Sequence, residues 1–118
     1  MEQARALAAE SEGSLRIVTG YFDPLLAGHA AALAERRAGA GGLLLLLRTP
    51  SDPLLPIRTR VELVAALRSV DWVAPLPGDT VPEWVRALPA NRLVNFESDD
   101  QDRRSAFLRH IHERHRLQ

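Results

Sequence analysis

The feature that most constrains the fold is an unbroken run of five leucines, Leu43 to Leu47, with Gly42 before it and Arg48 after it. By periodicity alone, such a run suits either a helix or a strand. Its short length, with glycines before it and a proline soon after it, favours a strand that is buried on both faces. Strands of this kind belong to parallel sheets that are covered by helices on both sides.

The rest of the chain supplies the partners that such a strand needs. Short strand-like segments occur at 15–19, 72–76 and 92–96, and segments of helical character follow the four strands at 30–38, 57–68, 80–88 and from about Asp102 onward. Alternating strands and helices predict a parallel sheet with right-handed crossovers. We therefore expect an α/β fold, a Rossmann-like three-layer α/β/α arrangement with a parallel sheet of about four strands.

Length and composition suit one domain. The chain has 118 residues, 46% of them hydrophobic, and we assign 1–118 to a single domain with a core at 15–117 and an N-terminal extension at 1–13. Fifteen basic residues, all arginine, balance fifteen acidic ones, so we expect no nucleic-acid partner and no binding to an anionic membrane surface. The absence of cysteine excludes disulfides and thiolate catalysis.

The sequence gives no sign of export. The first residues carry acidic side chains without the apolar stretch of a signal peptide, and the leucine run is far shorter than the roughly 18 residues of a membrane span. We expect a soluble, cytoplasmic protein.

A candidate binding loop follows the first strand. Gly20 comes directly after the apolar segment, and Gly28 and His29 open the next helix. In parallel sheets, ligands bind beyond the carboxyl ends of the strands. Helix N-termini attract phosphates through free N–H groups and the helix dipole, and His29 could add a donor. The loop therefore predicts a phosphate site.

The same loop carries a recognisable motif. The stretch G-Y-F-D-P-L-L-A-G-H resembles the G-x-F-D-x-x-H-x-G-H signature of the cytidylyltransferase-like nucleotidyltransferases, the superfamily that includes glycerol-phosphate cytidylyltransferase and the heptose-phosphate nucleotidyltransferases. Leu26 stands where the signature has its first histidine. The positions that match are Gly20, Phe22, Asp23, Gly28 and His29.

The resemblance extends over most of 15–96. Ser51-Asp52 is similar to a serine-aspartate pair of the family, and 58–73 looks like the helix before the family's third strand, with Arg60 at its arginine. The segment 81–94 is similar to the next helix and strand. The resemblance implies a strand order of 3-2-1-4, with the family's fifth strand lost.

The resemblance also implies a function. Enzymes of this family transfer CMP or AMP from CTP or ATP, together with Mg²⁺, to a phosphorylated small molecule and release pyrophosphate. The implied partners are a nucleotide and a small phosphorylated metabolite, and a homodimer is allowed because family members often dimerise. His29 would be catalytic, and the nucleotide- and phosphate-binding residues would be Gly20, Tyr21, Phe22, Asp23, Gly28, His29, Arg60 and Ser105.

Three departures from the family pattern predict impaired catalysis. Leu26 cannot donate a hydrogen bond, and the chain has no lysine, so Arg48 or Arg16 would have to replace the family's lysine. An acidic run, formed by Glu97, Asp99, Asp100 and Asp102, follows the fourth strand and would repel a triphosphate. The alternative is a pseudoenzyme, a catalytically inactive nucleotide-binding or protein-assembly module.

Some candidate residues also have purely structural interpretations. Asp23 could bind a metal, but an aspartate in such a loop more often accepts hydrogen bonds from backbone N–H groups. Gly28 and His29 could persist as helix-capping residues. We interpret the three C-terminal histidines as a solvated helix face and predict no metal-binding residue; they are His110, His112 and His115.

Overall fold

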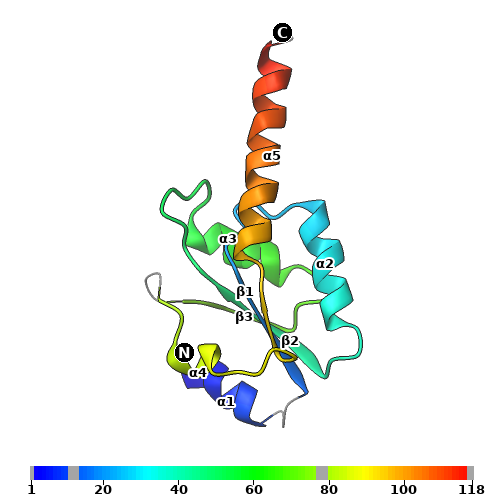
Figure 1. The fold of residues 1–118 in the computed structure, drawn as a ribbon, viewed down its shortest axis with the longest axis vertical. Helices are drawn as coiled ribbons and strands as arrows, with labels where there is room; N and C mark the ends of the chain where they lie inside the picture. Colours follow the sequence, from blue (N-terminus) through cyan, green and yellow to red (C-terminus); the bar gives the residue numbers. More distant parts are fainter. Residues whose placement is uncertain (1, 11–13, 77–79, 117–118) are drawn as a thin grey trace.

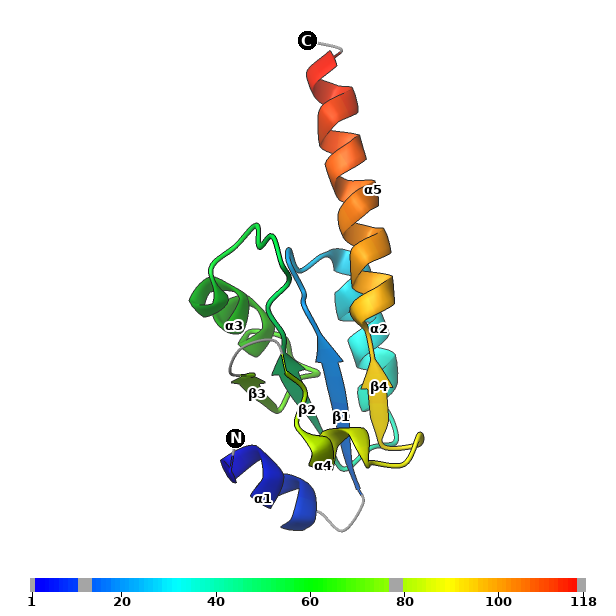
Figure 2. The same ribbon diagram turned by 60° about the vertical axis from the view of Figure 1, so that its left-hand side comes forward.

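The computed structural model describes residues 2–10, 14–76 and 80–116. Figures 1 and 2 show the elements, which follow in chain order: α1 (Glu2–Glu10), β1 (Leu15–Gly20), α2 (Ala27–Arg37), β2 (Gly42–Leu47), α3 (Ile57–Ala65), β3 (Trp72–Pro75), α4 (Glu83–Arg86), β4 (Leu93–Asn95) and α5 (Glu97–Arg116). The predicted domain bounds also include residues 1, 11–13, 77–79, 117 and 118, which lie outside the described residues.

The four strands form one parallel sheet in the order β3-β2-β1-β4, which confirms the predicted fold class and strand order. The central pair, β1 and β2, is in register from Leu15 opposite Gly42 to Gly20 opposite Leu47. Strand β4 pairs with β1 only over three residues. The chain therefore passes to one side of β1 for β2 and β3 and to the other side for β4, and the order reverses between β1 and β4.

The five leucines of β2 divide the core into two layers. Leu43, Leu45 and Leu47 pack on one face of the sheet with Leu33 of α2 and Val64 of α3. On the other face, the remaining two leucines pack with α1 and α4, through the buried residues Leu44, Leu46, Ala4, Ala8 and Val85. All five leucines are at most 1% exposed, as a strand covered on both faces requires.

Helix α1 lies within the segment 1–13, which is predicted from the sequence as an N-terminal extension. Ala4 and Ala8, four residues apart, place two small side chains against the sheet, where both are buried. The guanidinium of Arg92 donates to the carbonyl of Ala8, at 3.2 Å, and ties the helix to the start of β4. The alanine-rich segment offered no large apolar residues to mark this face.

Two predicted helix boundaries were wrong. Helix α5 begins at Glu97 and not near Asp102, so the acidic run lies in its first turns, where negative side chains favour the helix dipole. Helix α4 is limited to four residues within the predicted 80–88. Pro82 immediately precedes it, and Pro89, which lacks a backbone N–H, follows its end.

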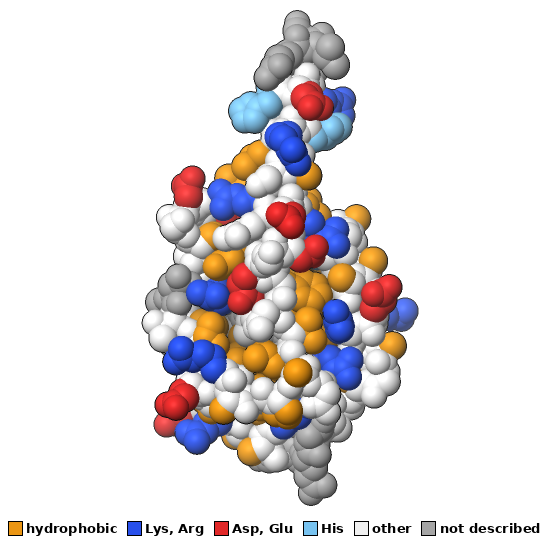
Figure 3. Space-filling model, in the orientation of Figure 1, with side chains coloured by type: hydrophobic (Ala, Val, Ile, Leu, Met, Phe, Trp, Pro, Cys, Tyr) orange, Lys and Arg blue, Asp and Glu red, His pale blue; other side chains and the backbone are white. Residues whose placement is uncertain are grey.

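Helix α5 extends beyond the carboxyl ends of the strands and away from the sheet (Figures 1 and 2). The molecule consequently measures 54 × 29 × 23 Å. Figure 3 shows histidine side chains toward the far end of this helix, away from the sheet, and all three are exposed. Within the described part of the chain, no helix combines the length and apolar character that crossing a membrane requires.

The two-layer core gives a direct stability test. Leu45→Ala should lower the free energy of unfolding by about 2–5 kcal/mol, because the fully buried side chain would leave a cavity between β2 and the helices that cover it. Leu54→Ala is the matched control, because Leu54 is 43% exposed. Denaturant unfolding measures both. Equal losses in the two variants would contradict the proposed burial of β2.

Candidate phosphate-binding site

The loop from Gly20 to His29 lies at the carboxyl ends of the strands, next to the point where the strand order reverses. Strand β1 ends at Gly20, whose carbonyl accepts from the Arg48 N–H at 2.8 Å. On the other side of β1, the Phe96 N–H donates to the Thr19 carbonyl, also at 2.8 Å. This is the location where open α/β sheets bind ligands.

Two consecutive backbone N–H groups converge at the start of this loop. Phe22 has a φ of 47°, a left-handed conformation that is uncommon for a residue with a side chain. Successive N–H groups around such a residue form a concave anion-binding nest. The N–H groups of Tyr21 and Phe22 both donate to Oδ2 of Asp100, at 2.7 and 3.3 Å. We call these two N–H groups together with His29 the anion cradle.

His29 completes the anion cradle from the first turn of α2. Its Nδ1 accepts from the Leu26 N–H at 3.0 Å, which leaves Nε2 to carry the proton of a neutral imidazole. Nε2 lies 2.5 Å from Oδ1 of Asp100, at ion-pair distance, and neither atom has a hydrogen-bond partner of good geometry among the described residues. His29 therefore both caps the helix through one nitrogen and directs the other at an anion. Leu26 contributes its backbone N–H to this arrangement.

Two glycines of the motif allow close packing around the anion cradle. A Cβ atom on Gly20 would lie 2.6 Å from the Phe22 ring and 2.7 Å from Oδ2 of Asp100. A Cβ atom on Gly28 would lie 1.8 Å from a guanidinium nitrogen of Arg103, on α5. Gly20 thus makes room for a buried ring and the carboxylate, whereas Gly28 makes room for the end of a flexible side chain.

Asp23 ties the loop after β2 to the loop after β1. The side chain is buried, and its two oxygens accept from the N–H groups of Leu54 and Leu55, at 2.6 and 2.8 Å. Aspartate is well suited to this role because its carboxylate accepts several backbone hydrogen bonds at once. This geometry matches the structural interpretation of Asp23 given by the sequence.

Arg60, on α3, also connects the loops after β1 and β2, and its side chain is 1% exposed. Its guanidinium donates to the carbonyls of Leu55, Tyr21 and Arg48, at 3.1, 3.1 and 2.8 Å. Burial lowers the pKa of this guanidinium, and the nearby Asp23 carboxylate opposes that shift. The structure thus uses the Arg60 donors to hold the two loops together.

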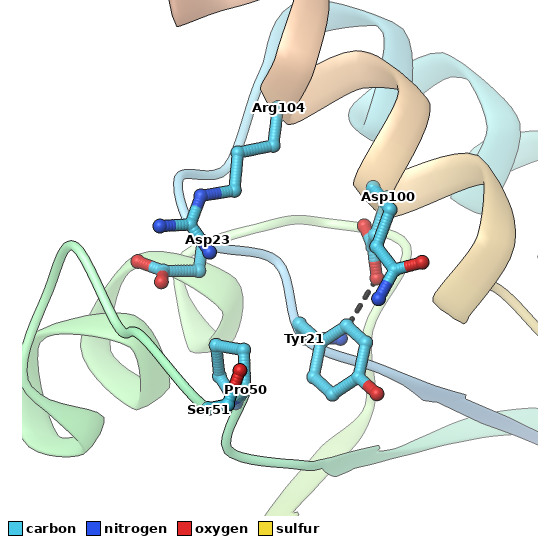
Figure 4. Close-up of a pocket in the computed structure, with 7 residues that line it drawn as sticks. Tyr21, Asp23, Pro50, Ser51, Asp100 and Arg104 are labelled. Atoms are coloured by element: carbon cyan, nitrogen blue, oxygen red, sulfur yellow. Dashed lines mark hydrogen bonds between the residues drawn. The ribbon is translucent and has the colours of Figure 1, made fainter.

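A pocket of about 190 Å³ opens beside the anion cradle. Figure 4 shows Asp100 and Arg104 reaching into it from α5, opposite Tyr21, Pro50 and Ser51. Arg104 donates to the Asp52 carbonyl at 2.6 Å. The pocket is smaller than the roughly 300–1,000 Å³ typical of small-molecule sites.

Of the three remaining candidate residues from the sequence, one lies at the site and two do not. Arg48 lies at the site, 3.2 Å from Glu97 through its guanidinium and 5.4 Å from the centre of the Tyr21 ring. Arg16 lies in the first half of β1, away from the strand's carboxyl end, and donates to the Arg36 carbonyl. Ser105 is exposed on α5, in its ninth position, and therefore lies within that helix and not at its N-terminus.

Two residues of the site, Asp100 and Arg104, are not predicted by the sequence. Asp100 is expected there only as part of an acidic run that repels a triphosphate, and no motif includes Arg104. A helix start at Glu97 would have been the signal, because residues four apart on a helix lie on one face. That spacing brings both side chains toward the pocket.

Histidine, aspartate and glutamate are the side chains around this site that could bind a metal ion. Among residues 2–10, 14–76 and 80–116, no three histidine, aspartate or glutamate side chains gather in a way that could hold a metal ion. Both oxygens of Asp23 already accept backbone hydrogen bonds.

Arg60 can be tested by a change that keeps its charge. Arg60→Lys should lower the free energy of unfolding by about 1–3 kcal/mol, because an ammonium group cannot reach the three carbonyls that the planar guanidinium serves. Arg58→Lys, on the same helix and 90% exposed, should cause no measurable change. Equal stability of the two variants in denaturant unfolding would rule out the loop-joining role.

The two glycines should respond differently to the same substitution. Gly20→Ala should destabilise the fold by about 1–3 kcal/mol, because the buried Phe22 ring and Asp100 must shift. Gly28→Ala should change stability little, since the end of the Arg103 side chain can move and alanine favours a helix. Thermal unfolding of both variants measures the difference, and a larger loss for Gly28→Ala would contradict this packing.

Comparison with known proteins supports the family indicated by the motif. No protein-family model matches the chain. The chain is similar to the protein named Bifunctional protein HldE from Edwardsiella ictaluri, with 36% identity over 98 residues, which cover 75% of this chain and 20% of that protein. For the protein of the same name from Sodalis glossinidius, the identity is 33% over 89 residues, covering 68% of this chain and 18% of the relative.

The Bifunctional protein HldE of Pectobacterium carotovorum is 29% identical over 103 residues, which cover 80% of this chain and 22% of that protein. The chain thus spans about a fifth of the length of these relatives. These similarities support a nucleotidyltransferase-type family, within the cytidylyltransferase-like superfamily, for this chain.

Proposed function

We propose that this chain is a nucleotidyltransferase-family domain that binds CTP or ATP and whose transfer of CMP or AMP to a phosphorylated small molecule is impaired. The observation that carries this proposal is the anion cradle. Three donors, from Tyr21, Phe22 and His29, meet at one point at the carboxyl end of β1. That point is where the motif resemblance expects phosphate groups.

The proposed chemistry is an in-line displacement. An oxygen of the acceptor's phosphate forms a bond to the α-phosphorus of the nucleotide while the bond to pyrophosphate breaks. The protein's task in such a reaction is to position the two reactants and to stabilise charge on the phosphate oxygens. The N–H groups of Tyr21 and Phe22 and the Nε2 proton of His29 would donate to those oxygens. Mg²⁺ would arrive with the nucleotide and neutralise part of its charge.

We infer impaired nucleotidyl transfer from the positions where the family has a histidine and a lysine that donate to phosphate oxygens. Leu26 has no side-chain donor, and loss of one transition-state donor lowers kcat by about 10²–10³. No lysine is present, and Arg48, the nearest substitute, already faces Glu97. The phosphate site therefore keeps its backbone donors and one histidine and lacks two side-chain groups.

The alternative is a catalytically inactive module for nucleotide binding or protein assembly. The extension of α5 beyond the sheet favours this second candidate (Figure 2). Three apolar side chains, Phe107, Leu108 and Ile111, remain partly exposed there. An assembly role would use this helix and would not require an open phosphate site.

Calorimetric titration with CTP and with ATP, each with Mg²⁺, tests nucleotide binding. We expect heat of binding with one of the two nucleotides. Cytidine and adenosine are the controls: they should bind far more weakly because they carry no phosphate for the anion cradle. Equal binding of a nucleotide and its nucleoside would remove the basis of the proposal, and so would the absence of nucleotide binding both in wild type and in a variant whose Asp100 carboxylate is replaced by an uncharged amide, Asp100→Asn.

Restoring the missing donor tests the cause of the impairment. Leu26→His should raise the rate of pyrophosphate release from CTP or ATP in the presence of phosphorylated acceptors, by up to about 10²–10³. Leu26→Met is the control, because it changes the side chain without adding a donor. If the two variants release pyrophosphate equally slowly, the missing histidine is not what limits catalysis.

A further inference from the structure

The carboxylate of Asp100 occupies the position that a phosphoryl group would take. Its Oδ2 accepts from the N–H groups of Tyr21 and Phe22, and its Oδ1 lies 2.5 Å from Nε2 of His29. Asp100 is only 4% exposed, so water contributes little to its solvation. Charged acceptors form the stronger hydrogen bonds with such donors, and the anion cradle therefore suits this carboxylate well.

The short strand β4 and the immediate start of α5 position Asp100 beside the anion cradle. Strand β4 ends at Asn95, and α5 begins at Glu97 with only Phe96 between them. Phe96 is fixed by its N–H bond to Thr19 and packs at 5.7 Å from the Phe22 ring. The N–H of Asp100 then donates to the Phe96 carbonyl at 2.7 Å, in the first turn of α5. The helix start is therefore held against β1, with Asp100 facing the anion cradle.

Neighbouring contacts hold the same helical turn. Glu97 contacts Arg48 at 3.2 Å and lies 2.7 Å from the Thr19 hydroxyl. Asp99, by contrast, is about half exposed and pairs with Arg103 on its own helix. Of these acidic residues, Asp100 contacts the donors of the anion cradle, whereas Asp99 carries the same charge nearby without touching them.

We infer that Asp100 is a built-in competitor for the phosphate site: its carboxylate and a phosphoryl group of the ligand bind the same donors and exclude each other. The inference rests on the proposed function and adds a way in which ligand binding to the phosphate site is regulated. Two anions cannot share three donors at hydrogen-bond distance, because their charges repel strongly at such separations. Ligand entry therefore requires Asp100 to leave, by rotation of its side chain or by movement of the first turn of α5.

The test compares Asp100→Asn with wild type and with Asp99→Asn, using inorganic pyrophosphate, CTP with Mg²⁺ and ATP with Mg²⁺ as probes. Asparagine keeps the shape and one acceptor but removes the charge. We expect Asp100→Asn to bind pyrophosphate at least about tenfold more tightly than wild type. Asp99→Asn should resemble wild type, which separates competition for the donors from a general loss of negative charge.

The outcomes separate this inference from the proposed function. Tighter pyrophosphate binding without nucleotide binding supports the competitor and rejects the nucleotide-binding domain. Equal nucleotide and pyrophosphate binding by wild type and Asp100→Asn rejects the competitor and leaves the proposed function standing. Failure of all three proteins to bind any probe rejects both.

Thermal unfolding keeps the test decisive if the substitution weakens the fold. Pyrophosphate should raise the Tm of Asp100→Asn, and of Asp100→Ser as a second variant, more than it raises the Tm of wild type. In that case the ligand takes over the donors that Asp100 has released. An unchanged Tm for both variants would overturn the inference.

Discussion

The contact between Asp100 and the anion cradle joins the parts of the chain on which the site depends. One carboxylate connects the loop after β1, the first turn of α2 and the first turn of α5. It satisfies two backbone N–H groups that a left-handed residue, Phe22, directs to one point. Without an anion at that point, these buried donors would lack partners, which is costly. The structure therefore requires an acceptor there, and the chain supplies a carboxylate of its own.

Arg60 and Asp23 make this site rigid from the other side. Together they make five hydrogen bonds to backbone groups of the loops after β1 and β2. Both residues belong to the motifs that resemble the nucleotidyltransferase family, and in this structure both hold loops in place. Preorganised donors of this kind are what phosphate chemistry uses, since the protein then needs little rearrangement to stabilise charge. The two loops are thus held by contacts that do not include the side chain of Leu26, which stands where the family signature has its first histidine.

The sequence predicted the fold well because its main signals are local. The leucine run of β2 and the strand-helix alternation identify a parallel sheet without knowledge of distant contacts, and the loop from Gly20 to His29 is located by the strand before it and the helix after it. Asp100 could not be assigned in the same way, because its contact with Tyr21 spans 79 residues and depends on where α5 begins. Helix α1 was missed because its buried face consists of alanines, which give little hydrophobic pattern.

The most direct test of this account observes the N–H groups of Tyr21 and Phe22 by ¹⁵N–¹H NMR. In Asp100→Asn, both amide proton resonances should move upfield, because their hydrogen bonds to a charged carboxylate are lost, and saturating pyrophosphate should move them back downfield. The same addition should leave them in place in wild type. Pyrophosphate-induced shifts confined to other residues, or equal shifts of these two amides in both proteins, would contradict the claim that Asp100 occupies the phosphate site.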